Sequence, residues 1–105
     1  MRFHHLGLEV FSIDDSLSFY CGYLQFELEQ VLLLGGEKIY FLTNGGLRLE
    51  LVESKEAPNM HICFEVKEFP ANLPADKEYH SYENGWESCF FNNGEGQLIE
   101  LLKRN

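Results

Sequence analysis

The sequence predicts an α+β fold in which two tandem β-α-β-β-β repeats build one eight-stranded, incompletely closed, barrel-like sheet. Two internal similarities predict this fold. Residues 5–10 (HLGLEV) are nearly repeated at residues 61–66 (HICFEV). Residues 46–52 are echoed by residues 96–102, and each of these segments has a Gly followed four positions later by a Glu. Each half of the chain therefore supplies one strand that opens on His and one that carries Glu between apolar residues.

The first repeat has well-marked elements. A strand is predicted at residues 2–10, where apolar side chains alternate with polar ones or Gly. An amphipathic helix follows to about Gly22, because Ser12 can cap it and two aspartates favour the positive end of its dipole. Gly-containing turns then separate three further strands, which are predicted at residues 26–34, 38–43 and 47–53.

The second repeat has the same strand order but a weaker helix. Its strands are predicted at residues 60–67, 78–83, 86–92 and 97–103. Residues 68–77 hold Pro70 and Pro74 and have no apolar stripe of helical period, so we expect a truncated helix of at most one turn. We interpret residues 1–105 as one domain with repeats at 1–54 and 59–105, and Pro58 ends the joint between them.

Composition narrows the class of partner and compartment. The net charge is −9, from 17 acidic and 8 basic side chains, which argues against nucleic acid or an anionic membrane as partner. The three cysteines have no Cys-x-x-Cys spacing, so no disulfide framework or zinc ribbon is predicted. The sequence has no signal-peptide segment and no apolar run near 18 residues, and we expect a cytoplasmic protein.

Strand alternation collects four chemically active side chains on the polar faces of the predicted strands. His5 and His61 open two strands, and Glu50 and Glu100 lie on two others. Pseudo-two-fold symmetry should bring these four together across a central cleft. Two neutral imidazoles and two carboxylates together carry two negative charges, which equal the charge of one divalent cation. This set of nitrogen and oxygen donors suits Zn, Ni, Co or Fe better than Ca or Mg. By the same alternation His4 should point away from His5, and we treat it as incidental.

With these residues the chain resembles the glyoxalase I / bleomycin-resistance / extradiol-dioxygenase group, the vicinal oxygen chelate superfamily. The resemblance covers nearly the whole chain, and its marks, in order, are the His5 strand, Ser18-Phe19-Tyr20, Leu49-Glu50-Leu51, the His61 strand and Ile99-Glu100-Leu101. It implies metal positions at His5, Glu50, His61 and Glu100. Dioxygenases and fosfomycin-modifying transferases lack a carboxylate at position 50, and bleomycin-binding relatives generally lack the metal set. Glu50 therefore favours the glyoxalase I-like branch.

The resemblance implies a metal-dependent lyase or isomerase, similar to lactoylglutathione lyase, that acts on a small vicinal-oxygen substrate such as a thiol–aldehyde hemithioacetal. Its cofactor would be a divalent ion, Ni, Zn, Co or Mn. Either Glu100 or Glu50 would move the proton, and we prefer Glu100. The alternatives are a metal-free small-molecule binding protein of the bleomycin-resistance type and a metal-dependent dioxygenase or thiol transferase.

Several residues depart from the family pattern or extend it. Glu9 stands where the glutathione-using enzyme has Arg and would repel a glutathione carboxylate, and Gln25 replaces the usual Gly before the second strand. Arg48 and Cys63 are candidate substrate-binding residues, although Arg48 could equally pair with a neighbouring carboxylate.

Because the truncated helix leaves one flank of the sheet thinly covered and the family often dimerises, we expect a homodimer.

Overall fold

The computed structural model describes residues 1–56, 59–95 and 97–104, so the predictions made for Pro58 and Gly96 lie outside the described residues. Its elements, in chain order, are β1 (Arg2–Val10), α1 (Ile13–Leu17), η1 (Ser18–Tyr23), β2 (Glu27–Leu34), β3 (Glu37–Asn44), β4 (Leu47–Glu53), β5 (Met60–Glu65), β6 (Lys77–Ser81), β7 (Glu87–Asn92) and β8 (Leu98–Lys103). The β1 and β4 boundaries agree with the prediction, and the other strand ends agree with it or differ by at most two residues.

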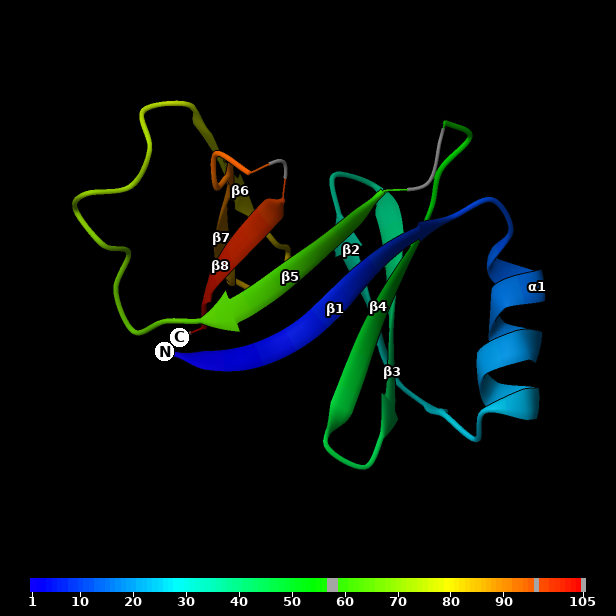
Figure 1. Ribbon diagram of the computed structural model, residues 1–105. Coiled ribbons are helices and arrows are strands. Elements are labelled where there is room, and N and C mark those ends of the chain that lie inside the picture. The colour runs from blue at the N-terminus through cyan, green and yellow to red at the C-terminus, as the bar shows by residue number, and fades with distance from the viewer. Residues whose placement is uncertain (57–58, 96, 105) are drawn as a thin grey trace.

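All eight strands form one sheet in the order β2-β3-β4-β1-β5-β8-β7-β6. The sheet curls into a half-barrel with β1 and β5 side by side at its centre and both chain termini at one end (Figure 1). β1 pairs in parallel with β4, β5 pairs in parallel with β8, and β1 and β5 are antiparallel to each other. The predicted α+β fold class, with two related halves, is confirmed.

The helical segment of the first repeat begins as predicted and ends irregularly. The Oγ of Ser12 accepts a hydrogen bond of 3.2 Å from the Asp15 backbone N–H, which is an N-cap. After α1 the chain continues as a π-helix, η1, in which each turn takes up more residues than an α-helix. The helical segment ends at Tyr23, and Gln25 before β2 has a φ of 63°, which lies in the left-handed region that favours Gly.

The sheet buries apolar side chains on both faces. On the convex face the helical segment covers one cluster, which contains Ile13, Phe26, Leu42, Leu49 and Leu51. Inside the half-barrel lies a second cluster, which contains Ile39, Phe41, Cys63, Tyr82 and Leu102. The first cluster belongs to the first repeat, whereas the second joins residues of both.

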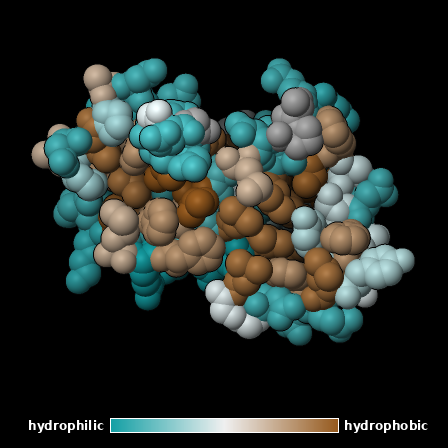
Figure 2. Space-filling model, viewed as in Figure 1, coloured by the Kyte–Doolittle hydropathy of each residue, from teal (hydrophilic) through white to brown (hydrophobic). Residues whose placement is uncertain are grey.

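The second repeat has no helix over its convex face within the described residues. Residues 66–76 form an extended loop with bends and one turn, in agreement with the predicted truncation. Apolar side chains of the central strands are consequently exposed there, with Phe3 at 44%, Met60 at 54% and Ile62 at 38% of their full accessible area. Figure 2 shows apolar side chains gathered over this face of β1 and β5. No helix in the described part of the chain is long and apolar enough to span a membrane.

Candidate metal centre

The four central strands bring the two repeated His–Glu pairs to one place inside the half-barrel. In the β1–β5 register His5 lies opposite Cys63, and Gly7 lies opposite His61. In the flanking parallel pairs Glu50 lies beside Gly7 and Glu100 lies beside Cys63. The two His and the two Glu therefore occupy symmetric positions around the contact between β1 and β5.

The donor atoms of these four residues converge tightly. The Nε2 atom of His5 lies 3.2 Å from Glu50 Oε2 and 3.1 Å from Glu100 Oε1. The Nε2 atom of His61 lies 3.5 Å from Glu50 Oε1 and 3.0 Å from Glu100 Oε1. The two Nε2 atoms are 3.2 Å apart. One donor atom from each residue lies within 4.8 Å of the others.

This arrangement leaves hydrogen-bonding capacity unused in a buried place. His5 and Glu100 are 0% exposed and Glu50 is 3% exposed. Glu50 Oε2 and Glu100 Oε1 are buried, and both lie against the single Nε2 atom of His5. One N–H of an imidazole cannot point at two carboxylates together, so protons alone do not satisfy these oxygens. Two N and two O donors aimed at one point fit a divalent cation, and binding of such a cation there stays a prediction.

The electrostatics of the metal-free site couple His5 to the carboxylates. Burial lowers the pKa of His5, but the hydrogen bonds and charges of Glu100 and Glu50 outweigh burial and raise that pKa to about 9. Burial raises the pKa of Glu100, and the hydrogen bonds and charges of His5 and His61 outweigh it and hold that pKa well below its usual range. The metal-free site therefore binds a proton strongly on His5, and a metal must displace that proton.

The expectation for His4 is wrong. The register of β1 against β5 shifts between Phe3 and His5, and this β-bulge turns His4 to the same side as His5. His4 is 4% exposed, and its Nδ1 lies 2.7 Å from Nδ1 of His5. Burial and the neighbouring charge of His5 lower the pKa of His4 to about 3. His4 is thus a neutral imidazole directly behind a predicted metal ligand.

Two further contacts of the site were not predicted. The hydroxyl of Tyr82 donates a hydrogen bond of 3.1 Å to Oε2 of Glu100, and Tyr82 is buried. Gly7 lies directly under the His61 ring, and a Cβ atom at this position would overlap that ring. The glycine is visible in the sequence, but its role depends on the register of β1 against β5. No pattern in the sequence links Tyr82 to Glu100.

The two predicted substrate-binding residues lie outside the central cleft. Arg48 donates two hydrogen bonds to the Glu29 carboxylate, of 2.8 and 3.0 Å, and a third of 3.3 Å to the His4 carbonyl. Cys63 is buried within the inner apolar cluster, and burial raises the pKa of its thiol. Their roles in binding substrate stay predictions, and the contacts observed for Arg48 fit the alternative of ion pairing.

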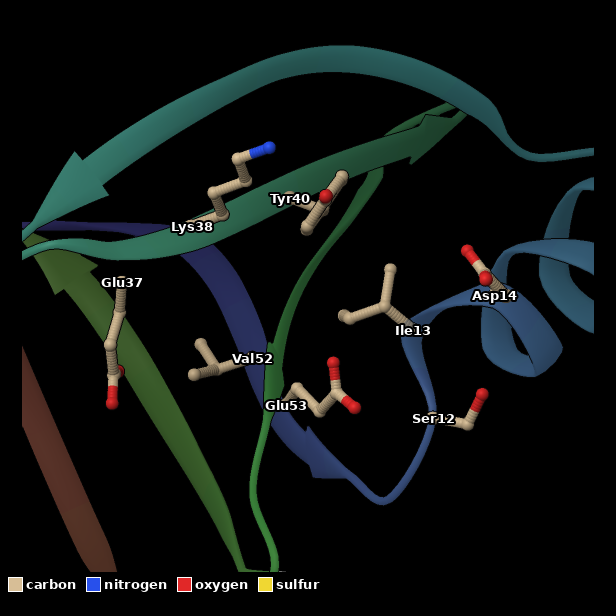
Figure 3. Close-up of a pocket in the computed structure, with 8 residues that line it drawn as sticks. All are labelled: Ser12, Ile13, Asp14, Glu37, Lys38, Tyr40, Val52 and Glu53. Atoms are coloured by element: carbon tan, nitrogen blue, oxygen red, sulfur yellow. The ribbon is translucent and has the colours of Figure 1, made fainter.

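A cleft of about 510 Å³ leads from the surface to Glu50 and His61, and its lining residues are Glu9, Leu34, Glu37, Ile39, Glu50, Val52, Glu53, Ser54, Lys55, Glu56, His61, Phe90 and Leu98. A separate hollow lies between β3, β4 and the start of α1 (Figure 3). That hollow contains none of the four converging residues, whereas the cleft reaches two of them, Glu50 and His61.

Comparison with known proteins identifies the family. The model of the Glyoxalase/Bleomycin resistance protein/Dioxygenase superfamily matches residues 2–80. The chain therefore belongs to this superfamily, which confirms the resemblance found in the sequence. A search of curated proteins gives no significant match.

Several solved structures have the same fold. The hypothetical protein BH1468 from Bacillus halodurans C-125 is 25% identical, with a TM-score of 0.76, and the match covers 99% of this chain and 94% of that chain. Methylmalonyl-CoA epimerase from Mycobacterium tuberculosis is 16% identical, with a TM-score of 0.78 and coverages of 99% and 88%. A variant of the Streptomyces coelicolor methylmalonyl-CoA epimerase, in complex with 2-nitronate-propionyl-CoA, is 20% identical, with a TM-score of 0.76 and coverages of 98% and 96%. At these identities the two epimerases show a common fold.

Proposed function

We propose that this protein is a divalent-metal-dependent lyase or isomerase of the glyoxalase I type that acts on a small substrate with vicinal oxygens, such as a thiol–aldehyde hemithioacetal. The observation that carries the proposal is the convergence of His5, Glu50, His61 and Glu100 at the inner end of a cleft. These four residues would hold the metal ion, which would be Ni, Zn, Co or Mn. The metal would act as a Lewis acid on a substrate oxygen.

The residues of the site suggest how a proton would move. Glu50 lines the cleft, so its carboxylate is placed to accept a proton from a substrate bound there. Glu100 is fully buried and accepts a hydrogen bond from Tyr82, which holds it in place. We therefore assign the proton transfer to Glu50 and keep Glu100, which we preferred on the sequence alone, as the alternative.

The first experiment measures metal content in protein purified without chelator, followed by the unfolding temperature with added Ni, Zn, Co and Mn. We expect about one ion per chain, and about 2.7 kcal/mol of added stability when the free ion is 100-fold above its Kd. The double variant His5→Ala/His61→Ala should lose both effects. Metal-free protein whose unfolding temperature none of these ions changes would contradict the proposal and favour a metal-free binding protein of the bleomycin-resistance type.

The second experiment separates the enzymatic alternatives. Solvent-deuterium incorporation into a hemithioacetal substrate tests proton transfer, and oxygen uptake with a catechol tests the dioxygenase alternative. Glu50→Gln should reduce exchange by at least 100-fold if Glu50 is the base, whereas Glu100→Gln should do so if Glu100 is. Metal retention in each variant must be checked, because both residues are proposed ligands.

The epimerase neighbours raise a second substrate class, CoA esters, for which proton transfer is equally suitable chemistry. We do not favour it, because five carboxylates and one ammonium group line the cleft and a CoA ester is strongly anionic.

We further propose a cytoplasmic homodimer in which a second copy covers the exposed face around Phe3, Met60 and Ile62. Sedimentation of the purified protein tests the dimer.

A further inference from the structure

The cleft over the candidate metal centre has a strongly negative lining. Its ionisable side chains are one lysine, one histidine and five glutamates, namely Lys55, His61, Glu9, Glu37, Glu50, Glu53 and Glu56. The remaining walls are mainly apolar, with Leu34, Ile39, Val52, Phe90 and Leu98. The cleft therefore combines an apolar body with an acidic entrance.

Little within the described residues neutralises this entrance. Lys55 Nζ lies 3.6 Å from Glu53, but the lysine side chain is 87% exposed, so the ion pair is weak. No ion pair among the described residues involves Glu9, Glu37 or Glu56. Arg48 lies toward the other end of β4, opposite Thr43, and is paired with Glu29.

The acidic residues do not all face the cleft equally. In Figure 3 the side chain of Glu37 extends on the side of β3 nearer to β5, whereas the Glu53 carboxylate is directed toward Ser12. Glu37 and Glu53 both line the separate hollow beside α1 as well as the cleft, and of the two it is the Glu53 carboxylate that is directed into the hollow. Glu9, Glu37 and Glu56 are left as the carboxylates that define the charge at the entrance.

A second observation supports a ligand at the inner end of this cleft. Glu50 lines the cleft and is only 3% exposed, and its Oε2 shares the single Nε2 atom of His5 with Glu100. One imidazole N–H cannot satisfy both carboxylates, so Glu50 Oε2 has capacity left for a bound group. A divalent ion would balance the charges of Glu50 and Glu100, but it would leave the charges of the entrance uncompensated.

We propose that the substrate of this site is a neutral or cationic small molecule with vicinal oxygens and an apolar body, and that Glu9, Glu37 and Glu56 exclude anionic analogues. This inference rests on the proposed metal-dependent function, because it concerns the molecules that enter the same cleft. It extends that function by assigning a charge class to the substrate, together with the residues that select it.

The expected size of the effect follows from Coulomb's law. A carboxylate about 10 Å from a unit charge in water changes binding by about twofold, so three carboxylates change it by about eightfold for each unit of ligand charge. The interaction is between exposed groups, and salt at about 0.5 M should remove most of it.

The test uses three hydroxamates that chelate through the same vicinal oxygens but differ in charge. These are glycine hydroxamate, which carries an ammonium group, neutral acetohydroxamate, and the monohydroxamate of succinate, which carries a carboxylate. Their Kd values are measured by the visible spectrum of the Co²⁺-loaded protein at low salt. We expect the cation to bind about eightfold tighter than the neutral probe, and the neutral probe about eightfold tighter than the anion.

Variants assign the effect to the named residues. Glu9→Gln/Glu37→Gln/Glu56→Gln should bring the three Kd values close together without loss of Co²⁺. The matched control Glu27→Gln/Glu78→Gln/Glu87→Gln changes the net charge equally at exposed positions outside the cleft lining and should keep most of the spread. Equal or tighter binding of the anion to Co²⁺-loaded wild-type protein would overturn the charge inference alone. Failure of the wild-type protein to bind Co²⁺ would overturn the proposed function and this inference with it.

Discussion

The two repeats supply the same pair of side chains from different surroundings. In the first repeat a capped helical segment covers the sheet, whereas in the second a loop replaces the helix and leaves the sheet exposed. His5 is 0% exposed at the side chain, but its counterpart His61 is 13% exposed and lines the cleft. For the Glu residues the buried member comes from the other repeat: Glu100 of the second repeat is 0% exposed, and Glu50 of the first repeat lines the cleft.

The β1–β5 register explains this difference. The position opposite His5 is occupied by Cys63, whose buried Sγ lies within 4.8 Å of a nitrogen of the His5 ring. The position opposite His61 is occupied by Gly7, which leaves room for that ring. A duplicated sequence thus gives one buried His–Glu pair, His5 and Glu100, and one pair that lines the cleft, His61 and Glu50. The following predictions test this division.

The largest expected difference concerns the stability of the metal-free protein. His5→Ala removes a buried partner of two carboxylates and should destabilise the fold by about 3 kcal/mol, because it leaves buried charge uncompensated. His61→Ala, at the edge of the cleft, should cost clearly less. Urea unfolding of chelator-treated protein measures both, and His80→Ala, on the exposed edge strand β6, is the control. Equal losses for His5 and His61 would contradict the division.

The second prediction concerns pH. His5 has a pKa raised from 6.5 to about 9, so the folded metal-free protein binds a proton that the unfolded chain releases near pH 6.5. The resulting stability is fully present below pH 6.5 and is lost as pH rises to about 9, by about 3 kcal/mol at most. Unfolding measured between pH 6 and pH 9.5 should show this decline in the wild-type protein and in His61→Ala but not in His5→Ala.

The third prediction concerns the space beneath His61. Gly7→Ala places a methyl group against the His61 ring and should displace it, which weakens metal binding by at least tenfold. Gly46→Ala is the matched control, because its added methyl group meets no atom within 4 Å. Co²⁺ titration measures both variants, and unchanged affinity in Gly7→Ala would show that the ring moves without cost.

The fourth prediction assigns a positioning role to His4. A metal held by Nε2 of His5 would leave the proton of His5 on Nδ1, and Nδ1 of His4 lies 2.7 Å away, where it could accept that proton. His4→Phe removes the acceptor but keeps the ring, and should weaken Co²⁺ binding by about tenfold. His4→Asn offers a side-chain oxygen and should restore part of the affinity. If both variants lose equal affinity, His4 acts through packing against Phe41 and Trp86.

The smallest expected effect lies outside the site, in the helical segment that only the first repeat has among the described residues. Gln25 has a φ of 63°, and Gly at this position should stabilise the protein by about 0.5–1 kcal/mol, because it removes the left-handed strain of a side chain. Thermal unfolding measures the change. The control Gln30→Gly, in strand β2, should have the opposite sign.

The accuracy of the sequence predictions follows from which interactions are local. The strands of both repeats were recognised because alternation and Gly-containing turns act within a few residues. His5, Glu50, His61 and Glu100 were grouped because a repeat implies symmetric positions, and the structure brings their donor atoms together. The prediction for His4 was wrong because a β-bulge breaks the alternation on which it rested.

By itself, the sequence determined the fold class, the strand order of each repeat and the residue types available for a metal site, because these depend on local periodicity and on an internal repeat. The tertiary structure decided which His is buried, which Glu faces the cleft, and that Tyr82 holds Glu100. It also decided that Glu9, Glu37 and Glu56 share one entrance. These outcomes depend on the register between strands far apart in the chain and on sheet curvature, which no short segment specifies.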